Sequence, residues 1–281
     1  MSVLAVPEVD AAIEAALGFL LTRQRQDDLW HDFKTLAGES TFWVTGYVGR
    51  HLWNLCPGSA ALARAADALL AHQHSQGGWG YNDQVPADAD STLWALTFLH
   101  RIGREPGGGW GRSVQFLLDH QGPDGGFATY RADHPIREYV QMPSTLPFDG
   151  WTGSHPEITA SILALLGALG LAPDEPSLVR GLDCLLGRQR ADGCWPAYWW
   201  PGPFMATCQA IRALKALGMT SAAPAVRRAF QGVLDYQRPD GAWATDGVDQ
   251  TPVFSTALAL NALTAFGPDG VPPDRLAAGA H

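Results

Sequence analysis

The chain has 281 residues with a formal net charge of −9, and 17% of its residues are charged, compared with roughly 25% in average globular proteins. This acidic balance argues against nucleic acid as a partner, because a nucleic-acid surface needs clustered Lys and Arg. The first thirty residues lack a basic leader, and their apolar run (residues 15–21) is too short to span a bilayer, so we expect a cytoplasmic protein.

One pattern recurs five times along the chain. Each copy has an apolar segment of helical periodicity, then a glutamine, then a Gly/Asp/Pro-rich loop that ends on an aromatic residue six positions after the glutamine. The glutamine–aromatic pairs are Gln24 and Trp30, Gln73 and Trp79, Gln121 and Phe127, Gln189 and Trp195, and Gln237 and Trp243. A second apolar helix follows each aromatic. We therefore expect five helix hairpins in one domain, residues 1–281, with a core at about 12–267 and a tail at 268–281.

The second helix of each predicted hairpin is less charged than the first, as in residues 157–170. A helix that is apolar all round is buried, so the second helices should form an inner layer and the first helices an outer layer. Such hairpins stack into either an open superhelix or a closed ring, and periodicity alone leaves both open. The loop tryptophans should hold the hairpins together.

A threonine lies near the start of each predicted inner helix. The five aligned residues are Thr41, Thr92, Thr159, Thr207 and Thr256. Threonine in this position can cap a helix by accepting hydrogen bonds from its first amide groups, so we interpret the column as repeated N-caps.

The third hairpin is about twenty residues longer than the others, and the extra residues fall at 131–151. Long loops in compact domains are often lids. This insertion carries Arg131, His134 and Arg137, which suit either a diphosphate contact or an ordered flap with solvated charges.

The loop signature resembles the QW motif of squalene–hopene cyclases and other class II terpene cyclases, and more distantly the repeats of protein prenyltransferase β subunits. The resemblance covers residues 12 to 267. It implies an all-α fold, an (α/α)5–6 barrel or toroid of repeated helix hairpins with QW-like motifs, whose inner helices surround a cavity.

In such a barrel the residues just before the threonines converge at one end. Two positions before each threonine stand Glu39, Asp90, Glu157, Met205 and Phe254. Four positions before Thr92 and Thr159 stand Asp88 and His155.

The run Asp88-Ala89-Asp90-Ser91-Thr92 looks like the DxDD motif of class II terpene cyclases, with Ser91 in place of the last aspartate. The resemblance implies that Asp90 protonates an alkene or epoxide, with Asp88, His155 and Glu157 in support. The alternative is an acidic N-cap pair that the helix dipole stabilises.

A cationic cyclisation needs walls that stabilise positive charge, and aromatic faces do this. With Glu39, Ser91 and Met205, the expected substrate-binding residues are Phe42, Trp43, Trp94, Trp151, Tyr198, Trp199, Trp200, Phe204 and Phe254.

No metal or other cofactor is expected. The acids between Asp27 and Asp32 should be solvated loop residues at the opposite end from the converging column. Asp192 and Cys194 resemble two zinc ligands of protein prenyltransferases, but two residues do not complete a zinc site. The four cysteines form no CxxC pair and should be reduced.

The leading hypothesis is a cyclase or isomerase that acts on an isoprenoid or polyene through protonation by Asp90. One alternative is an acid–base lyase or isomerase of specialised metabolism that uses the same residues. Another is a non-catalytic barrel that binds a ligand or a protein. The expected partner is a hydrophobic small molecule; peripheral membrane contact and oligomeric state stay open.

Overall fold

The computed structural model describes residues 7–245 and 252–267, in two compact units. The first unit comprises residues 1–116 and 135–142, and the second comprises residues 117–134 and 143–281. The tail predicted at 268–281 lies outside the described residues. Within the described ranges, no helix has the length and apolar character needed to cross a membrane.

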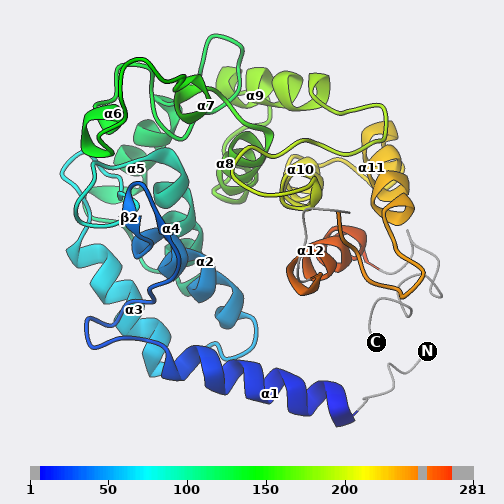
Figure 1. Cartoon of the computed structure of the whole chain (residues 1–281), viewed down its shortest axis with the longest axis horizontal. Helices are drawn as coiled ribbons and strands as arrows, with labels where there is room; N and C mark the ends of the chain where they lie inside the picture. The colour runs from blue at the N-terminus through cyan, green and yellow to red at the C-terminus, as the bar shows by residue number, and fades with distance from the viewer. Residues whose placement is uncertain (1–6, 246–251, 268–281) are drawn as a thin grey trace. The chain divides into compact units, whose positions relative to one another are not determined.

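The first unit contains the first two hairpins and a short β-ribbon (Figure 1). Its helices are α1 (Pro7–Thr22), α2 (Phe42–Trp53), α3 (Ala60–Ala71), α4 (Ala89–Ile102), α5 (Gly109–Leu118), whose last two residues belong to the second unit, and α6 (Ile136–Tyr139). Strands β1 (Lys34–Thr35) and β2 (Gly38–Glu39) pair antiparallel, with Lys34 opposite Glu39. Helix α2 packs mainly against α4, and α3 contacts both.

The second unit contains the later hairpins. Its helices are α7 (Asp149–Thr152), α8 (Pro156–Ala168), α9 (Pro176–Gly187), α10 (Phe204–Ala216), α11 (Pro224–Asp235) and α12 (Val253–Leu263). Helix α10 packs between α8 and α12, while α9 and α11 lie outside α8 and α10 (Figure 1).

Burial separates the inner helices α2, α4, α8 and α10 from the outer helices α3 and α9, whereas in the last hairpin the outer helix α11 has seven buried residues and the inner helix α12 has five. Ten residues of α8 are buried, whereas only Leu178, Gly181 and Leu185 are buried in α9. The prediction of paired helices with a more buried inner layer is therefore confirmed for the hairpins before the last one.

Each glutamine–aromatic loop is held by a repeated set of hydrogen bonds. The glutamine Nε2 donates to the backbone carbonyl four residues later, as Gln189 does to Gly193. The indole Nε1 donates to a carbonyl of the preceding outer helix, ten residues earlier, as Trp195 does to Leu185. Because Trp79, Trp195 and Trp243 are fully buried, their predicted role in holding the hairpins together is confirmed.

The same glutamines also reach the next outer helix. Gln24, Gln121 and Gln189 donate to carbonyl oxygens at or beside its start, and Gln73 donates to the hydroxyl of Ser113 in α5. Each of these bonds joins consecutive hairpins.

The inner-helix threonines bind the loops instead of capping their own helices. The Thr92 Oγ1 accepts the Trp79 N–H at 2.9 Å and donates to the Trp79 carbonyl. The equivalent acceptors are Thr45, Thr159, Thr207 and Thr256. The N-cap interpretation was therefore wrong: these threonines lie inside the helix, and their hydroxyls turn toward the preceding loop.

The register of the first hairpin was also wrong. Thr45 bonds Trp30, whereas Thr41 is the residue just before α2 and makes no side-chain cap. The β-ribbon lengthens the connection between Trp30 and α2, so aligning the run Ser40-Thr41-Phe42 with the later hairpins misplaced the first threonine by four residues. In the corrected column, Trp43 takes the place of Glu39.

Candidate active site

Asp88 and Ser91 fix the start of α4 in the first unit. The Asp88 Oδ1 accepts the Ser91 N–H at 2.7 Å, and its Oδ2 accepts the Ser91 hydroxyl at 2.8 Å. Asp88 is thus the N-cap of α4, with 1% of its surface exposed. The cap interpretation that the sequence left open holds for Asp88.

Burial raises the pKa of Asp88 to about 7, while the hydrogen bonds from Ser91 and the Asp90 amide oppose that rise. Near neutral pH this carboxyl group therefore holds a proton part of the time. Ser91 supplies a neutral donor at the position where the terpene-cyclase motif has another carboxylate.

Asp90 is the second residue of α4 and is half-buried. Trp94 lies four residues later, on the same face of the helix. The Trp94 ring makes edge contacts with Trp43, at 6.1 Å between centroids, and with Tyr47, at 4.9 Å. Trp43 and Tyr47 are stacked at 5.1 Å. We call Trp43, Tyr47 and Trp94 the aromatic wall.

The sequence reasoning missed Tyr47. Its signal is the four-residue spacing from Trp43, which places both rings on one face of α2. The same spacing is typical of ordinary core packing, so it did not stand out.

A second cluster forms in the second unit, around the start of α8. The Glu157 Oε1 accepts the backbone N–H groups of Tyr198 and Trp199 at 2.7 and 3.0 Å. Glu157 is 3% exposed, and its Oε2 has no hydrogen-bond partner among the described residues. This carboxylate therefore fixes the aromatic loop before α10.

His155 lies beside Glu157 and stacks on Tyr198, with 4.4 Å between ring centroids. Its Nε2 bonds the Gly150 carbonyl at 2.6 Å. Burial lowers the pKa of His155, and attraction to Glu157 opposes that change.

Aromatic residues predicted for the third, fourth and fifth hairpins also form contacts in the second unit. Trp199 makes an edge contact with Trp151 at 5.2 Å, and its Nε1 donates to Thr129. Trp200 contacts Phe254 at 5.1 Å.

Two predicted aromatic residues have other neighbours. Phe42 packs against His72 at the end of α3, and Phe204 packs against Tyr236 at the end of α11. Both precede their threonine by three positions instead of two, and they pack against the end of the outer helix of the next hairpin. Met205 is buried in α10, where its sulfur accepts the Gln209 amide at 3.6 Å.

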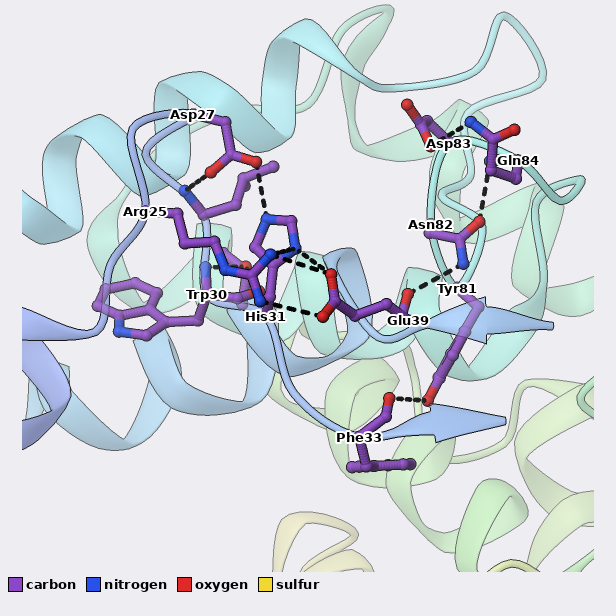
Figure 2. Close-up of polar contacts among 12 residues, drawn as sticks. Arg25, Asp27, Trp30, His31, Phe33, Glu39, Tyr81, Asn82, Asp83 and Gln84 are labelled. Atoms are coloured by element: carbon purple, nitrogen blue, oxygen red, sulfur yellow. Dashed lines mark hydrogen bonds and ion pairs between the residues drawn. The ribbon is translucent and has the colours of Figure 1, made fainter. Parts of the chain in front are cut away.

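Glu39 lies on β2 in a network of charged side chains, outside the corrected column (Figure 2). Arg25 donates two 3.0 Å hydrogen bonds to its carboxylate, and His31 lies 3.0 Å from it. The hydrogen bonds with Arg25 and then His31 lower the pKa of Glu39 to about 2. The alignment that placed Glu39 in one column with Asp90 and Glu157 was therefore wrong, and its predicted contact with a substrate stays a prediction.

The loop acids were also misplaced. Because the Trp30 N–H bonds Thr45 in the second turn of the helix, the loop of Asp27 and Asp28 lies at the same end of the hairpin as the start of α2. Asp27 pairs with His31 (Figure 2), and Asp28 pairs with Arg64.

The structure also describes the residues of two further ligand hypotheses, a zinc site at Cys194 and a diphosphate contact in the insertion. Burial raises the pKa of Cys194 to about 11, which keeps its thiol neutral. In the insertion, the exposed Arg131 pairs with Asp133. The lid and diphosphate roles of the insertion stay predictions.

The sequence and the fold both match known proteins. A family model described as the squalene–hopene cyclase C-terminal domain matches residues 81–252. Drimenyl diphosphate synthase of Streptomyces showdoensis is 43% identical over 70 residues, which cover 23% of this chain and 13% of that protein. The chain spans less than a third of the length of the curated relatives it matches.

Two solved structures match nearly the whole chain. A protein from Actinoplanes has a TM-score of 0.83 and 33% identity, covering 96% of this chain and 78% of that one. The type II terpene cyclase MstE from Scytonema has a TM-score of 0.82 and 29% identity, covering 98% and 78%, and a variant of it was solved with its substrate, geranylgeranyl dihydroxybenzoate. These likenesses confirm the predicted all-α, α/α-barrel fold class.

Proposed function

The chain belongs to the squalene–hopene cyclase C-terminal domain family, and from this membership we propose that it is a class II terpene cyclase-like enzyme. In this proposal, a carboxylic acid protonates a double bond or epoxide of an isoprenoid or polyene substrate, and the resulting cation cyclises or rearranges. In this proposal, the binding partner of the protein is its hydrophobic substrate.

The proposal rests chiefly on the position of Asp90 beside the aromatic wall. Protonation of carbon needs an acid held close to the alkene, and the cation that forms needs stabilisation by aromatic faces. Asp90 and Trp94 share one face of α4, and Trp94 contacts both Trp43 and Tyr47. One face of α4 therefore carries the acid and Trp94, and Trp94 in turn contacts the two rings on α2.

Asp88 has a positioning role in this proposal. It caps α4 and so fixes the turn that carries Asp90. The Ser91 hydroxyl donates to Asp88 without adding a negative charge. The motif can therefore keep its proton donor although its last aspartate is replaced.

We include His155 and Glu157 as supporting groups. The support for this is their burial and their contacts with Tyr198 and Trp199, which order an aromatic cluster suited to a cationic intermediate. Glu157→Gln keeps an oxygen that can accept the two backbone N–H groups, so it should fold and show reduced turnover.

The decisive experiment is product analysis by mass spectrometry. Purified protein is incubated with squalene, linear prenyl diphosphates and geranylgeranyl dihydroxybenzoate. We expect the wild type to convert at least one of them, Asp90→Asn to convert none, and the matched variant Asp83→Asn, at an exposed loop acid, to match the wild type.

Any of the following outcomes would overturn the proposal. Conversion of no substrate by the wild type would contradict an enzyme of this class. Unchanged turnover by Asp90→Asn would make Asp90 structural. Elimination without ring formation or rearrangement would favour a lyase, and binding without turnover would favour a non-catalytic ligand-binding protein.

A further inference from the structure

Arg50 of α2 is a buried cation in the first unit. It is only 5% exposed, and no carboxylate of the described residues lies within ion-pair distance of it. Its guanidinium carbon lies 5.5 Å from the centroid of the Trp94 ring. Its Nη1 donates to the His51 Nε2 at 3.2 Å.

Neither neighbour neutralises this charge. Burial lowers the pKa of His51, and nearby Arg101 lowers it further, so His51 is a neutral acceptor at pH 7. The Trp94 ring offers a quadrupole and no formal charge. Because a buried charge without a counter-ion is costly, an anion at Arg50 would be strongly favoured.

The position of Arg50 can be related to that of Asp90, the proposed proton donor. Trp94 follows Asp90 by four residues, which places its backbone about 6 Å farther along α4. Arg50 lies over the Trp94 ring, so the cation contacts the ring whose backbone stands about one helical turn from Asp90. An apolar chain lying on this wall would have Asp90 near one part and Arg50 near another.

We propose that Arg50 binds the oxyanion head group, a diphosphate or a carboxylate, of the prenyl substrate. This inference rests on the proposed function and adds the chemical class of the substrate. The planar guanidinium can present two parallel N–H donors to either oxyanion. The bond to His51 and the contact with Trp94 orient it.

The test compares three ligands with one carbon chain: farnesyl diphosphate, farnesoic acid and farnesol. Affinities are measured by calorimetry on the full chain carrying Asp90→Asn, so that no ligand is consumed. We expect one or both oxyanions to bind at least about tenfold more tightly than the alcohol. The oxyanion that binds more tightly identifies the head group.

Two variants connect the preference to Arg50. Arg50→Gln should bind the three ligands alike and keep its affinity for farnesol. Arg101→Gln, which removes an exposed positive charge on α4, should keep the preference. If Arg50→Gln does not fold, Arg50→Lys keeps the charge and the stem but loses the paired donors, and the preference should fall severalfold.

The proposal is overturned if the three ligands bind equally to the protein with Arg50 intact. It is also overturned if the preference survives in a folded Arg50→Gln or is unchanged in Arg50→Lys. These measurements use no turnover, so a failure here leaves protonation by Asp90 standing. Conversely, the oxyanion preference measured by calorimetry would still support the head-group site if the wild type converted no substrate.

Discussion

Asp88 and Glu39 lie in environments that shift their pKa values in opposite directions. Burial at the start of α4 raises the pKa of Asp88 to about 7, whereas Arg25 and His31 lower the pKa of Glu39 to about 2. At neutral pH Glu39 is therefore a fixed anion within an ion-pair network. Asp88 can exchange a proton there, close in sequence to the proposed acid.

The raised pKa of Asp88 makes folding stability depend on pH. The folded protein holds this proton more tightly than the unfolded chain, where the pKa is about 3.8. The stabilisation is therefore complete below pH 3.8 and is lost as the pH rises toward 7. Glu39 acts in the opposite sense, and its contribution is lost only as the pH falls from 4.5 toward 2.

Urea unfolding between pH 4 and 8 measures this effect. The free energy of unfolding of the wild type should fall with rising pH relative to that of Asp88→Asn, and the two curves should run parallel above about pH 7. Asparagine can still cap α4, so the variant should fold. Parallel curves over the whole range would show that Asp88 has an ordinary pKa.

At the scale of elements, each inner helix is joined to the loop before it through one threonine. The Thr92 hydroxyl bonds both the N–H and the carbonyl of the buried Trp79. The Trp79 carbonyl also accepts the Asp88 N–H, so replacing Thr92 leaves that carbonyl one bond but takes the side-chain acceptor from the Trp79 N–H.

Thr92→Val should lower the free energy of unfolding by about 1–3 kcal/mol, because a buried N–H loses its acceptor while the side-chain shape is kept. Thr97→Val is the matched control. The Thr97 hydroxyl bonds the Leu93 carbonyl within the same helix, so its loss should cost clearly less. Equal losses for the two variants in chemical denaturation would mean that the loop bond contributes nothing specific.

The contact between α2 and α4 depends on Gly46. A Cβ there would lie 2.5 Å from the Trp94 carbonyl carbon, so Gly46→Ala should push the helices apart and cost about 1–3 kcal/mol. It should also change the near-ultraviolet circular dichroism of the aromatic wall. Gly18→Ala in α1 has nothing within 4 Å and should be neutral or stabilising. A neutral Gly46→Ala would contradict the close packing.

These elements show how far sequence reasoning reaches. The hairpins were predictable because the glutamine, the loop and the tryptophan are close in sequence and recur at fixed spacing. The register of α2 was not, because the inserted β-ribbon gave a false Ser-Thr match at Thr41. Tyr47 and Arg50 were missed because a helical pattern does not show which buried residue lacks a charged partner.

For the whole molecule, the net charge of −9 opposes an anionic ligand at long range, while Arg50 would attract it at short range. These two effects can be distinguished by varying the salt concentration, because salt screens distant surface charges more than it screens a buried group. The rate constant of association and the final affinity should therefore respond differently to ionic strength.

Stopped-flow tryptophan fluorescence on the Asp90→Asn protein can measure this difference. The association rate constant of farnesyl diphosphate should increase from low salt to physiological salt, as the long-range repulsion is screened. That of farnesol should stay constant. A rate constant for the diphosphate that falls with salt would show that the local field of Arg50 dominates at long range.

The bonds between consecutive hairpins bear on how such chains can recombine. Gln24, Gln121 and Gln189 donate to the main-chain carbonyls of Ala61, Ser177 and Ala225. Any amino acid at the accepting position offers the same oxygen, so the connection makes no demand on the accepting side chain. Hairpins should thus behave as exchangeable modules, and chimeric chains with crossovers between hairpins should retain these joints. The joint after the second hairpin is the exception, because Gln73 donates to the Ser113 hydroxyl. A crossover at this joint must therefore keep Ser113.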